Sequence, residues 1–369
     1  MGERRVPRRS GLLLLVLLVA GGGGGASCGA GTEVHGDVRI RSQQDWAALV
    51  GAGTTLITGS LVIDGTDLVA LRPPATALER VGGTLSIQGN GWLSGAAFPA
   101  LTAVDGELLL VDDPLLSAVA FPVLERAGGL RVVRTDGLLA LALPALAEVG
   151  GHLIVNRDAV LRSLALPRLE TVAGFLQVEN QPALESIELP LLRDVAGGVA
   201  VLGDRALAEL RLPLLRTPGV DVSFDHALTT VSLPALTSSA VSLIDVPALR
   251  SVGLPVLASG ALEVTAAATL ESLSVPALAT VNGFLKLRFN DALAHLDLPA
   301  LTSVSGSLLV TNNPSLGGLG LPSLTRVAES LVITGNAALR QCLVDGVTAH
   351  LAAPPGVLET GGNGAGACP

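Results

Sequence analysis

Proline recurs at nearly constant intervals through most of this chain. Successive members of the series are 21 to 23 residues apart. The series consists of Pro99, Pro122, Pro144, Pro167, Pro190, Pro213, Pro234, Pro255, Pro276, Pro299 and Pro322. Because a unit of this size cannot bury its apolar residues without neighbours, the period predicts an array of stacked coils rather than one globular core.

Apolar residues occupy the same places in each unit. In the unit that starts at Pro299 they include Leu308 and Val310, and then Leu319 and Leu321. Apolar residues that alternate with variable ones are typical of a strand with one buried face. The predicted fold is therefore mainly β, a β-helix or solenoid of about a dozen coils of 21–23 residues.

Two further positions in the unit carry a recurrent residue type. Glycine stands seven places after many of the prolines and predicts a corner with a special backbone angle. Its members are Gly106, Gly151, Gly174, Gly197, Gly283 and Gly306. Leu-Pro itself is expected to close a strand at a corner where no ladder hydrogen bond is needed.

Short polar residues stand near the fourteenth place after the proline. They are Asp113, Asp136, Asp158, Gln181, Asp204, Asn290, Asn313 and Asn336, with Asp225 and Asp245 in the shorter units. We expect their side chains to cap turns by bonding backbone amides. A catalytic role for the pair Asp112 and Asp113 is the weaker alternative, since Asn312 and Asn313 hold the same two places.

The two ends of the array depart from the repeat and predict caps. Ser42 is a candidate helix N-cap with Asp45 three residues later, and Trp46 lies on the apolar face. Residues 37–58 are thus predicted to be an N-terminal cap with a first strand at 37–40, followed by solenoid repeats over 59–341. Residues 342–369 are predicted to be a C-terminal cap with a helix at 343–352, closed by a disulfide between Cys342 and Cys368. Two free thiols are the alternative.

The N-terminus has the features of an export signal. Four arginines between residues 4 and 9 precede the apolar run 12–20 and a stretch of small residues. Residues 1–27 are predicted to be a signal peptide and 28–36 a short tether. Cys28 stands where bacterial lipoproteins carry their acylated cysteine, so two alternatives stay open: a lipid anchor in the cell envelope, or a secreted protein.

The charge and the motifs bound the function. The net charge of −9 argues against a nucleic-acid partner. The nearly uniform turn lengths leave no long loops to build a catalytic cleft, and no phosphate loop, nucleophile elbow or metal motif occurs in the sequence. We expect no catalytic residues, no metal and no cofactor; a carbohydrate-active β-helix enzyme is the alternative.

Together the repeat and both ends resemble a known family. The repeat LPALTSVSGSLLVTNNPSLGGL, the first segment DVRIRSQQDWAALVGAGTTLITGSLVI and the last segments GNAALRQC and GNGAGACP are similar to receptor L-domains. The resemblance covers residues 36–369 and implies a right-handed, leucine-rich-repeat-like β-helix. This chain has more coils than those domains and no cysteine-rich module, so their ligands do not carry over.

The function predicted from these features is non-enzymatic binding at a cell surface or outside the cell, by a monomer. The partner would be a protein or a glycan, and a structural envelope spacer is the alternative. Outward-facing residues of two strands form the predicted binding face. They are Phe175, Gln177, Glu179, Phe284, Lys286 and Arg288.

Overall fold

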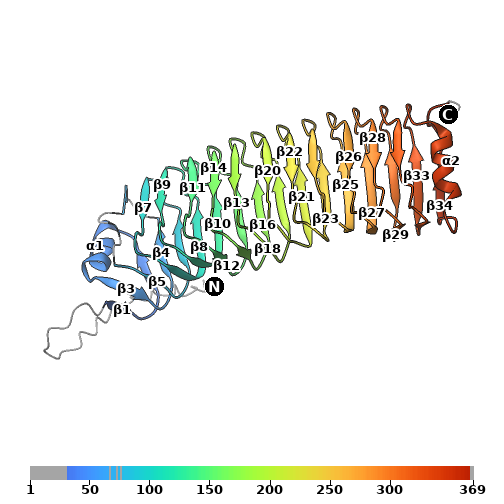
Figure 1. The fold of residues 1–369 in the computed structure, drawn as a ribbon. Helices are drawn as coiled ribbons and strands as arrows, with labels where there is room; N and C mark the ends of the chain where they lie inside the picture. Colours follow the sequence, from blue (N-terminus) through green and yellow to red (C-terminus); the bar gives the residue numbers. More distant parts are fainter. Residues whose placement is uncertain (1–30, 66–67, 72–73, 75–76, 366–369) are drawn as a thin grey trace, which may run out of the picture.

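The chain winds into one long parallel β-solenoid of about 14 turns, with a short helix at each end (Figure 1). The computed structural model describes residues 31–65, 68–71, 74 and 77–365. The predicted β-helix is confirmed. It has more turns than the dozen expected, because the segment predicted as the N-terminal cap also contributes strands that stay in register with the repeats.

One face of the solenoid is a continuous sheet of 23 strands, called here the main sheet. Its strands are β1 (Thr32–Val34), β2 (Val38–Ile40), β3 (Thr54–Ile57), β4 (Leu61–Asp64), β5 (Arg80–Val81), β6 (Leu85–Gln88), β8 (Ala103–Val111), β10 (Arg126–Val133), β12 (Glu148–Val149), β13 (Leu153–Asn156), β15 (Thr171–Val172), β16 (Leu176–Glu179), β18 (Asp194–Val195), β19 (Val199–Leu202), β21 (Gly219–Ser223), β23 (Ala240–Ile244), β25 (Ser259–Thr265), β27 (Thr280–Arg288), β29 (Ser303–Val304), β30 (Leu308–Thr311), β32 (Arg326–Val327), β33 (Ser330–Thr334) and β34 (Val357–Glu359).

Three-residue strands form a second side of the coil, in four small parallel sheets. They are β7 (Gly95–Ala97) with β9 (Ala118–Ala120); β11 (Ala140–Ala142), β14 (Ser163–Ala165) and β17 (Ser186–Glu188); β20 (Glu209–Arg211), β22 (Thr230–Ser232) and β24 (Ser251–Gly253); and β26 (Ser272–Ser274), β28 (His295–Asp297) and β31 (Gly318–Gly320).

The apolar residues of successive coils lie directly above one another. Leu153 pairs with Leu176, Leu176 with Val199, and Val199 with Val220, all in parallel register. These residues point inward and are at least 97% buried. One continuous aliphatic core therefore runs through the array, and each coil depends on its neighbours for burial.

The prolines lie in tight turns. The N–H of Leu301 donates to the carbonyl of Leu298 at 3.1 Å, which places Pro299 at the second position of a β-turn. Proline favours this position because its φ is already fixed near the required value. The prediction that Leu-Pro closes a strand at a corner is confirmed.

The glycine column has a different cause from the one predicted. Within it only Gly283 has a positive φ, of 101°. A Cβ on Gly106 would lie 2.7 Å from the carbonyl carbon of Gly83, and one on Gly197 would lie 2.9 Å from the amide nitrogen of Phe175. At the five positions other than Gly283 glycine is required because adjacent coils approach too closely for a side chain, whereas a Cβ on Gly283 would meet nothing within 4 Å.

Polar side chains form a ladder inside the solenoid. Oδ1 of Asn313 accepts the backbone N–H of Asn290 at 3.1 Å, and Oδ1 of Asn336 accepts that of Asn313 at 3.0 Å. The same bond recurs from coil to coil, which confirms the predicted capping role. The fully buried members are Asn90, Asp113, Thr135, Asp158, Gln181, Asp204, Asp225, Asn290, Asn313 and Asn336.

Two predicted members lie outside the buried ladder. Asp136 is exposed and Thr135 holds its place, because that unit is one residue shorter than its neighbours. Asp136 still bonds a backbone amide as predicted, since its Oδ1 accepts the N–H of Ala159 at 3.1 Å. Asp245 lies at the preceding corner with a φ of 54°, and Val246 is buried in its stead. The ladder is therefore interrupted between Asp225 and Asn290.

Both predicted cap helices are present at opposite ends of the solenoid (Figure 1). Helix α1 (Gln43–Gly51) begins after Ser42, whose Oγ accepts the N–H of Asp45 at 3.2 Å. Helix α2 (Gln341–Ala349) begins two residues earlier and ends three residues earlier than predicted. Trp46 is fully buried against Phe98, so it belongs to the core.

Strand β1 lies in the segment predicted to be a tether, and it pairs with β3. Among the described residues, neither helix is long and apolar enough to cross a membrane. The shorter units after Pro213 leave the main sheet unbroken, since β21 pairs with β19 on one side and β23 on the other. In the coils of Arg216 and Ser238, isolated bridges stand in place of the two-residue strand of the regular unit.

Candidate functional site

The predicted binding residues lie on the outward side of two strands of the main sheet. Phe175 directly precedes β16, which carries Gln177 and Glu179. The other three residues, Phe284, Lys286 and Arg288, are on β27. Strands β19, β21, β23 and β25 lie between them, which puts the two groups five strand spacings, or about 24 Å, apart. The structure brings them onto one face as two clusters.

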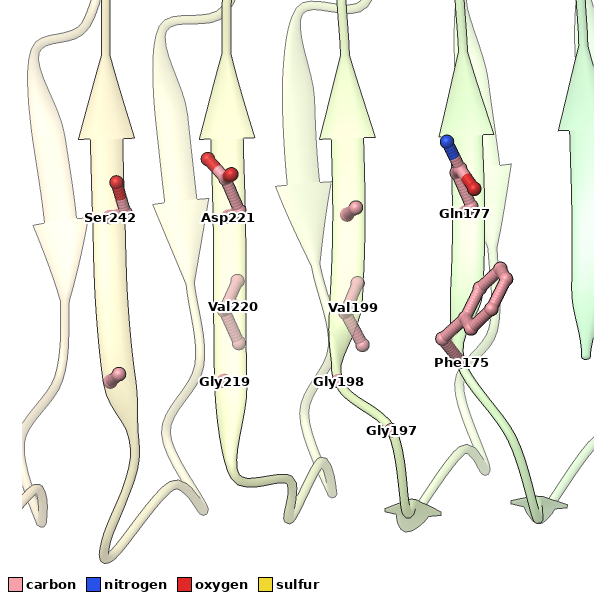
Figure 2. A pocket seen from close by; sticks show the side chains of 11 residues that line it. Phe175, Gln177, Gly197, Gly198, Val199, Gly219, Val220, Asp221 and Ser242 are labelled. Atoms are coloured by element: carbon pink, nitrogen blue, oxygen red, sulfur yellow. The ribbon is translucent and has the colours of Figure 1, made fainter.

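A shallow trough occupies the face next to Phe175. At the register of that phenylalanine, the following strands carry only Gly198, Gly219 and Ala240. Gln177, Ala200, Asp221 and Ser242 form the next row (Figure 2). The hollow has a volume of about 460 Å³ and is widely open to solvent. It forms because large side chains give way to glycine and alanine on three adjacent strands.

A stacked pair of aromatic rings, those of His152 and Phe175, borders one side of the trough. The rings of His152 and Phe175 lie 3.8 Å apart, centroid to centroid, with an interplanar angle of 29°. Nδ1 of His152 accepts the backbone N–H of Phe175 at 3.1 Å, so the neutral ring carries its proton on Nε2. The stack fixes the orientation of the phenylalanine ring before any ligand arrives.

Beyond the trough, β27 carries the second aromatic cluster. The ammonium of Lys286 lies 3.8 Å from the ring centroid of Phe284, within the range of a cation–π interaction. Nζ of Lys286 also lies 3.4 Å from Oε2 of Glu263 on β25. Arg288 instead lies over Phe289, 5.4 Å from its centroid. The two cations thus have separate partners.

The polar groups of the trough are held in place by neighbours on their own strands. Nε2 of Gln177 donates to Oε2 of Glu179 at 2.7 Å. The hydroxyl of Ser223 donates to Oδ1 of Asp221 at 2.6 Å. The trough therefore offers oriented oxygen acceptors, one of them a carboxylate, on a floor of small residues.

Two exposed aromatics that sequence reasoning missed lie at the rim of the same face. Phe224 directly follows β21 and Phe289 directly follows β27, and their side chains are 54% and 47% exposed. Both residues have a left-handed backbone, with φ of 65° and 57°. The available signal was their place in the unit, one residue before the ladder, where other coils carry aspartate, asparagine, arginine, alanine or glycine.

The pair considered for catalysis does not face one site. Asp112 is exposed and accepts two hydrogen bonds from Arg134, at 2.5 and 2.8 Å. The guanidinium holds the pKa of Asp112 below its usual range. Asp113 is fully buried in the ladder, where Oδ1 accepts the N–H of Asn90 at 2.7 Å, and burial raises its pKa to about 6.

The predictions made for the cysteines stay predictions. Cys342 lies in the first turn of α2, while Cys28, Cys368 and the signal peptide 1–27 lie outside the described residues. The chain near the C-terminus does return to this helix, since the N–H of Gln341 donates to the carbonyl of Gly364 at 3.1 Å. This proximity is compatible with the predicted Cys342–Cys368 disulfide.

Comparisons with protein-family models, with curated proteins and with solved structures find no match. The class of protein is thus defined by the fold alone, a parallel β-solenoid. The resemblance to receptor L-domains stays a prediction. Function has to be argued from the geometry of the face, because a solenoid fold hosts many activities.

Proposed function

We propose that this chain is a non-enzymatic binding protein, exported to the cell surface or the surrounding medium, that takes an extended ligand on the main sheet. The trough beside Phe175 supports this most strongly. It interrupts an otherwise regular face with small residues, and an oriented aromatic ring stands at its edge. Concave sites with a few fixed polar groups are the usual places for ligands.

Export rests on the arginine-led apolar segment at the N-terminus, and Cys28 offers a lipid anchor in the envelope as one of two ways to remain at the surface. A passive envelope spacer is the competing function. A spacer has no need of a trough, so blocking the trough separates the two. The surface carboxyls Asp112 and Asp136 play no part in the proposed binding.

The test uses a matched pair of blocking substitutions. Ala200→Arg places a long cation in the row of Gln177 and Asp221, whereas Ala165→Arg places one on the small sheet formed by β11, β14 and β17. Both alanines point outward, and each has a carboxylate at the same register on the next coil, Asp221 or Glu188. The two variants therefore perturb folding similarly.

Purified protein is incubated with the insoluble envelope fraction of the producing organism, and the retained fraction is measured by sedimentation. We expect Ala200→Arg to lower retention at least tenfold and Ala165→Arg to leave it unchanged. Equal retention of wild type and both variants would refute binding through the trough and favour the spacer. Circular dichroism of both variants checks that the sheet is intact.

A further inference from the structure

We propose, resting on the function above, that the ligand is an uncharged polysaccharide chain that lies along the solenoid axis, in contact with both the trough and the aromatic rim. The backbone of the trough strands limits how a ligand can bind. Strands β19, β21 and β23 each pair on both sides, so their ladder groups are already bonded. A peptide cannot add to this face as a further strand, and recognition must use side chains.

The side chains of the trough favour a neutral ligand rich in hydroxyl groups. Its accessible polar groups are the amide of Gln177, the carboxylate of Asp221 and the hydroxyl of Ser242. Glu179 adds a second carboxylate at the edge, while Lys286 on β27 is already paired with Glu263. Carboxylate and amide oxygens accept hydroxyl donors well, and this arrangement repels anionic polymers.

The rim supplies a second, independent observation. The left-handed corner recurs in every coil from Asp112 to Asn312, and the residues that hold it include Arg134 and Arg157, so the backbone angle itself belongs to the fold. What distinguishes Phe224 and Phe289 is a large apolar ring, about half exposed, at this corner. Two such rings in one row of the surface point to a ligand contact.

The rim overlaps the trough in part, since the trough extends from β16 to β23 while Phe224 follows β21 and Phe289 follows β27. Phe224, Asp245, Ala266 and Phe289 occupy the same corner on four consecutive coils, all with positive φ. The two rings are therefore three strand spacings, or about 14 Å, apart along the solenoid axis. Between them lie a carboxylate, which is 3.2 Å from Nε2 of His226, and a small residue.

The trough and the rim thus have the same composition. In each, aromatic rings lie in one row with small residues and carboxylates, and the row runs along the long axis of the solenoid. A pyranose ring has an apolar C–H face, which stacks on an aromatic ring, and hydroxyl groups at its edge, which bond carboxylates and amides. A chain of such rings repeats both features along one axis. A folded protein partner would instead need a contact of about 800 Å² on each side, and the trough, with a volume of about 460 Å³, is too small for one.

The binding test is affinity electrophoresis of the purified protein in native gels that contain a neutral glucan, mannan, xylan or galactan. We expect at least one polymer to retard the wild-type protein. Phe175→Ala and the double substitution Phe224→Ala with Phe289→Ala should each weaken that retardation at least tenfold. Leu139→Ala, at an exposed apolar residue that is 55% exposed on another side of the coil, is the matched control and should have no effect.

A second variant separates binding from folding. Phe224→Gly relieves the left-handed backbone, so the denaturant midpoint should stay the same or rise while retardation weakens at least tenfold. A fall in the midpoint together with unchanged retardation would overturn the role of the rim. The sign of the stability change is a readout that a purely structural phenylalanine would not give.

Treatment of the envelope fraction distinguishes the ligand class from the proposed function itself. Periodate cleaves the vicinal diols of sugars and should abolish the retention that Ala200→Arg also abolishes, whereas protease should leave it. Retention that is lost on protease treatment and kept after periodate would overturn the polysaccharide and leave the trough as a protein-binding site. Failure of every neutral polymer to retard the protein would also overturn it.

Discussion

The buried carboxyls of the ladder should make this solenoid less stable as the pH rises through neutrality. At the asparagine rungs each side chain makes two kinds of bond. Oδ1 of Asn290 accepts the N–H of Ala267 at 2.9 Å, and Nδ2 donates to the carbonyl of Val264 at 3.0 Å. At the aspartate rungs the first bond remains, since Oδ1 of Asp225 accepts the N–H of Asp204 at 2.6 Å.

The second bond is where aspartate and asparagine differ. By register, the carbonyls that correspond to that of Val264 are those of Val178 for Asp204 and Val201 for Asp225. Oδ2 of both aspartates is buried and accepts no hydrogen bond. An ionised carboxylate cannot bond a carbonyl oxygen, but a protonated carboxyl can donate to it. Burial raises the pKa of Asp204 to about 7 and that of Asp225 to about 8, where the charge of Asp204 adds to the effect.

The sign follows from proton linkage. A carboxyl with a higher pKa in the folded chain keeps its proton there and loses it on unfolding, so rising pH favours the unfolded state. The stability is complete below about pH 4 and is lost as the pH passes 7 to 8. Each such group changes the free energy of unfolding by up to about 1.4 kcal/mol per pH unit. Between pH 5 and pH 7 the pair should lose on the order of 4 kcal/mol.

The perturbation is Asp204→Asn combined with Asp225→Asn, and the assay is urea unfolding at pH 5 and pH 7. The double variant should be more stable than wild type at pH 7 by a few kcal/mol and should lose most of the difference between the two pH values. Asp136→Asn, at the exposed neighbour of the ladder, is the control and should keep the wild-type dependence. A wild-type stability that does not fall from pH 5 to pH 7, or a double variant that is less stable at pH 7, would refute the reasoning.

Four further outcomes are expected. Asn313→Ala removes the acceptor for Asn290 and should lower the free energy of unfolding by about 3 kcal/mol, while Asn282→Ala, at an exposed site, should change it little in the same urea assay. Gly106→Ala should destabilise by about 1 to 3 kcal/mol because its Cβ would meet the coil of Gly83, in contrast to Gly317→Ala, where the nearest atom is 4.0 Å away. Amide hydrogen exchange at pH 7 should be faster in β21 and β23 than in β30 and β33, because the coils of the trough are expected to be less stable than the coils with an asparagine ladder. Uniform protection would contradict this. Peptide mapping without reduction should recover Cys342 joined to Cys368, and two alkylated thiols would show that the pair is free.

Much of this fold follows from the sequence because two features of the repeat determine it. The proline spacing sets the coil, and the period of two around Leu176 and Val178 sets which side chains enter the core. For the same reason Phe175 and Gln177 were correctly predicted to face outward. The register also contains information that was not used: Glu263 and Lys286 are 23 residues apart, one coil, and they form an ion pair.

The errors arise where a unit changes length. The unit after Pro122 has 22 residues, so counting from the proline selects Asp136 in place of Thr135. The 21-residue units shift the ladder by two places, to the twelfth residue after the proline, and Asp245 is the eleventh residue after Pro234, which makes it the corner residue before Val246. Counting back from the buried leucine of the next turn avoids both errors, because that leucine and the ladder residue belong to the same tight turn, as Asn313 and Leu316 do.

The trough could not be predicted from any single unit. Gly198, Gly219 and Ala240 are unremarkable when each is considered alone, since small residues occur on the face elsewhere. A hollow forms only when parallel pairing sets the three beside one another and leaves Phe175 at the edge. The relevant property is a column across coils, which becomes visible only after the register is known.

The coils that carry the candidate site are also those that depart most from the regular repeat. Within residues 197–246 lie the glycine floor, the strained Phe224, the buried carboxyls of Asp204 and Asp225, and the break in the ladder at Val246. Each of these features lowers stability, whereas the coils from Asn290 onward carry an unbroken asparagine ladder.

In a solenoid, stability is shared with adjacent coils, so a weak stretch can persist between strong neighbours. Local departures from the best-packed sequence are expected where a surface is shaped for a ligand, because binding sites conflict with optimal packing. The concentration of three such departures besides Phe224 in the coils of one trough is therefore an argument for function that does not depend on the aromatic residues.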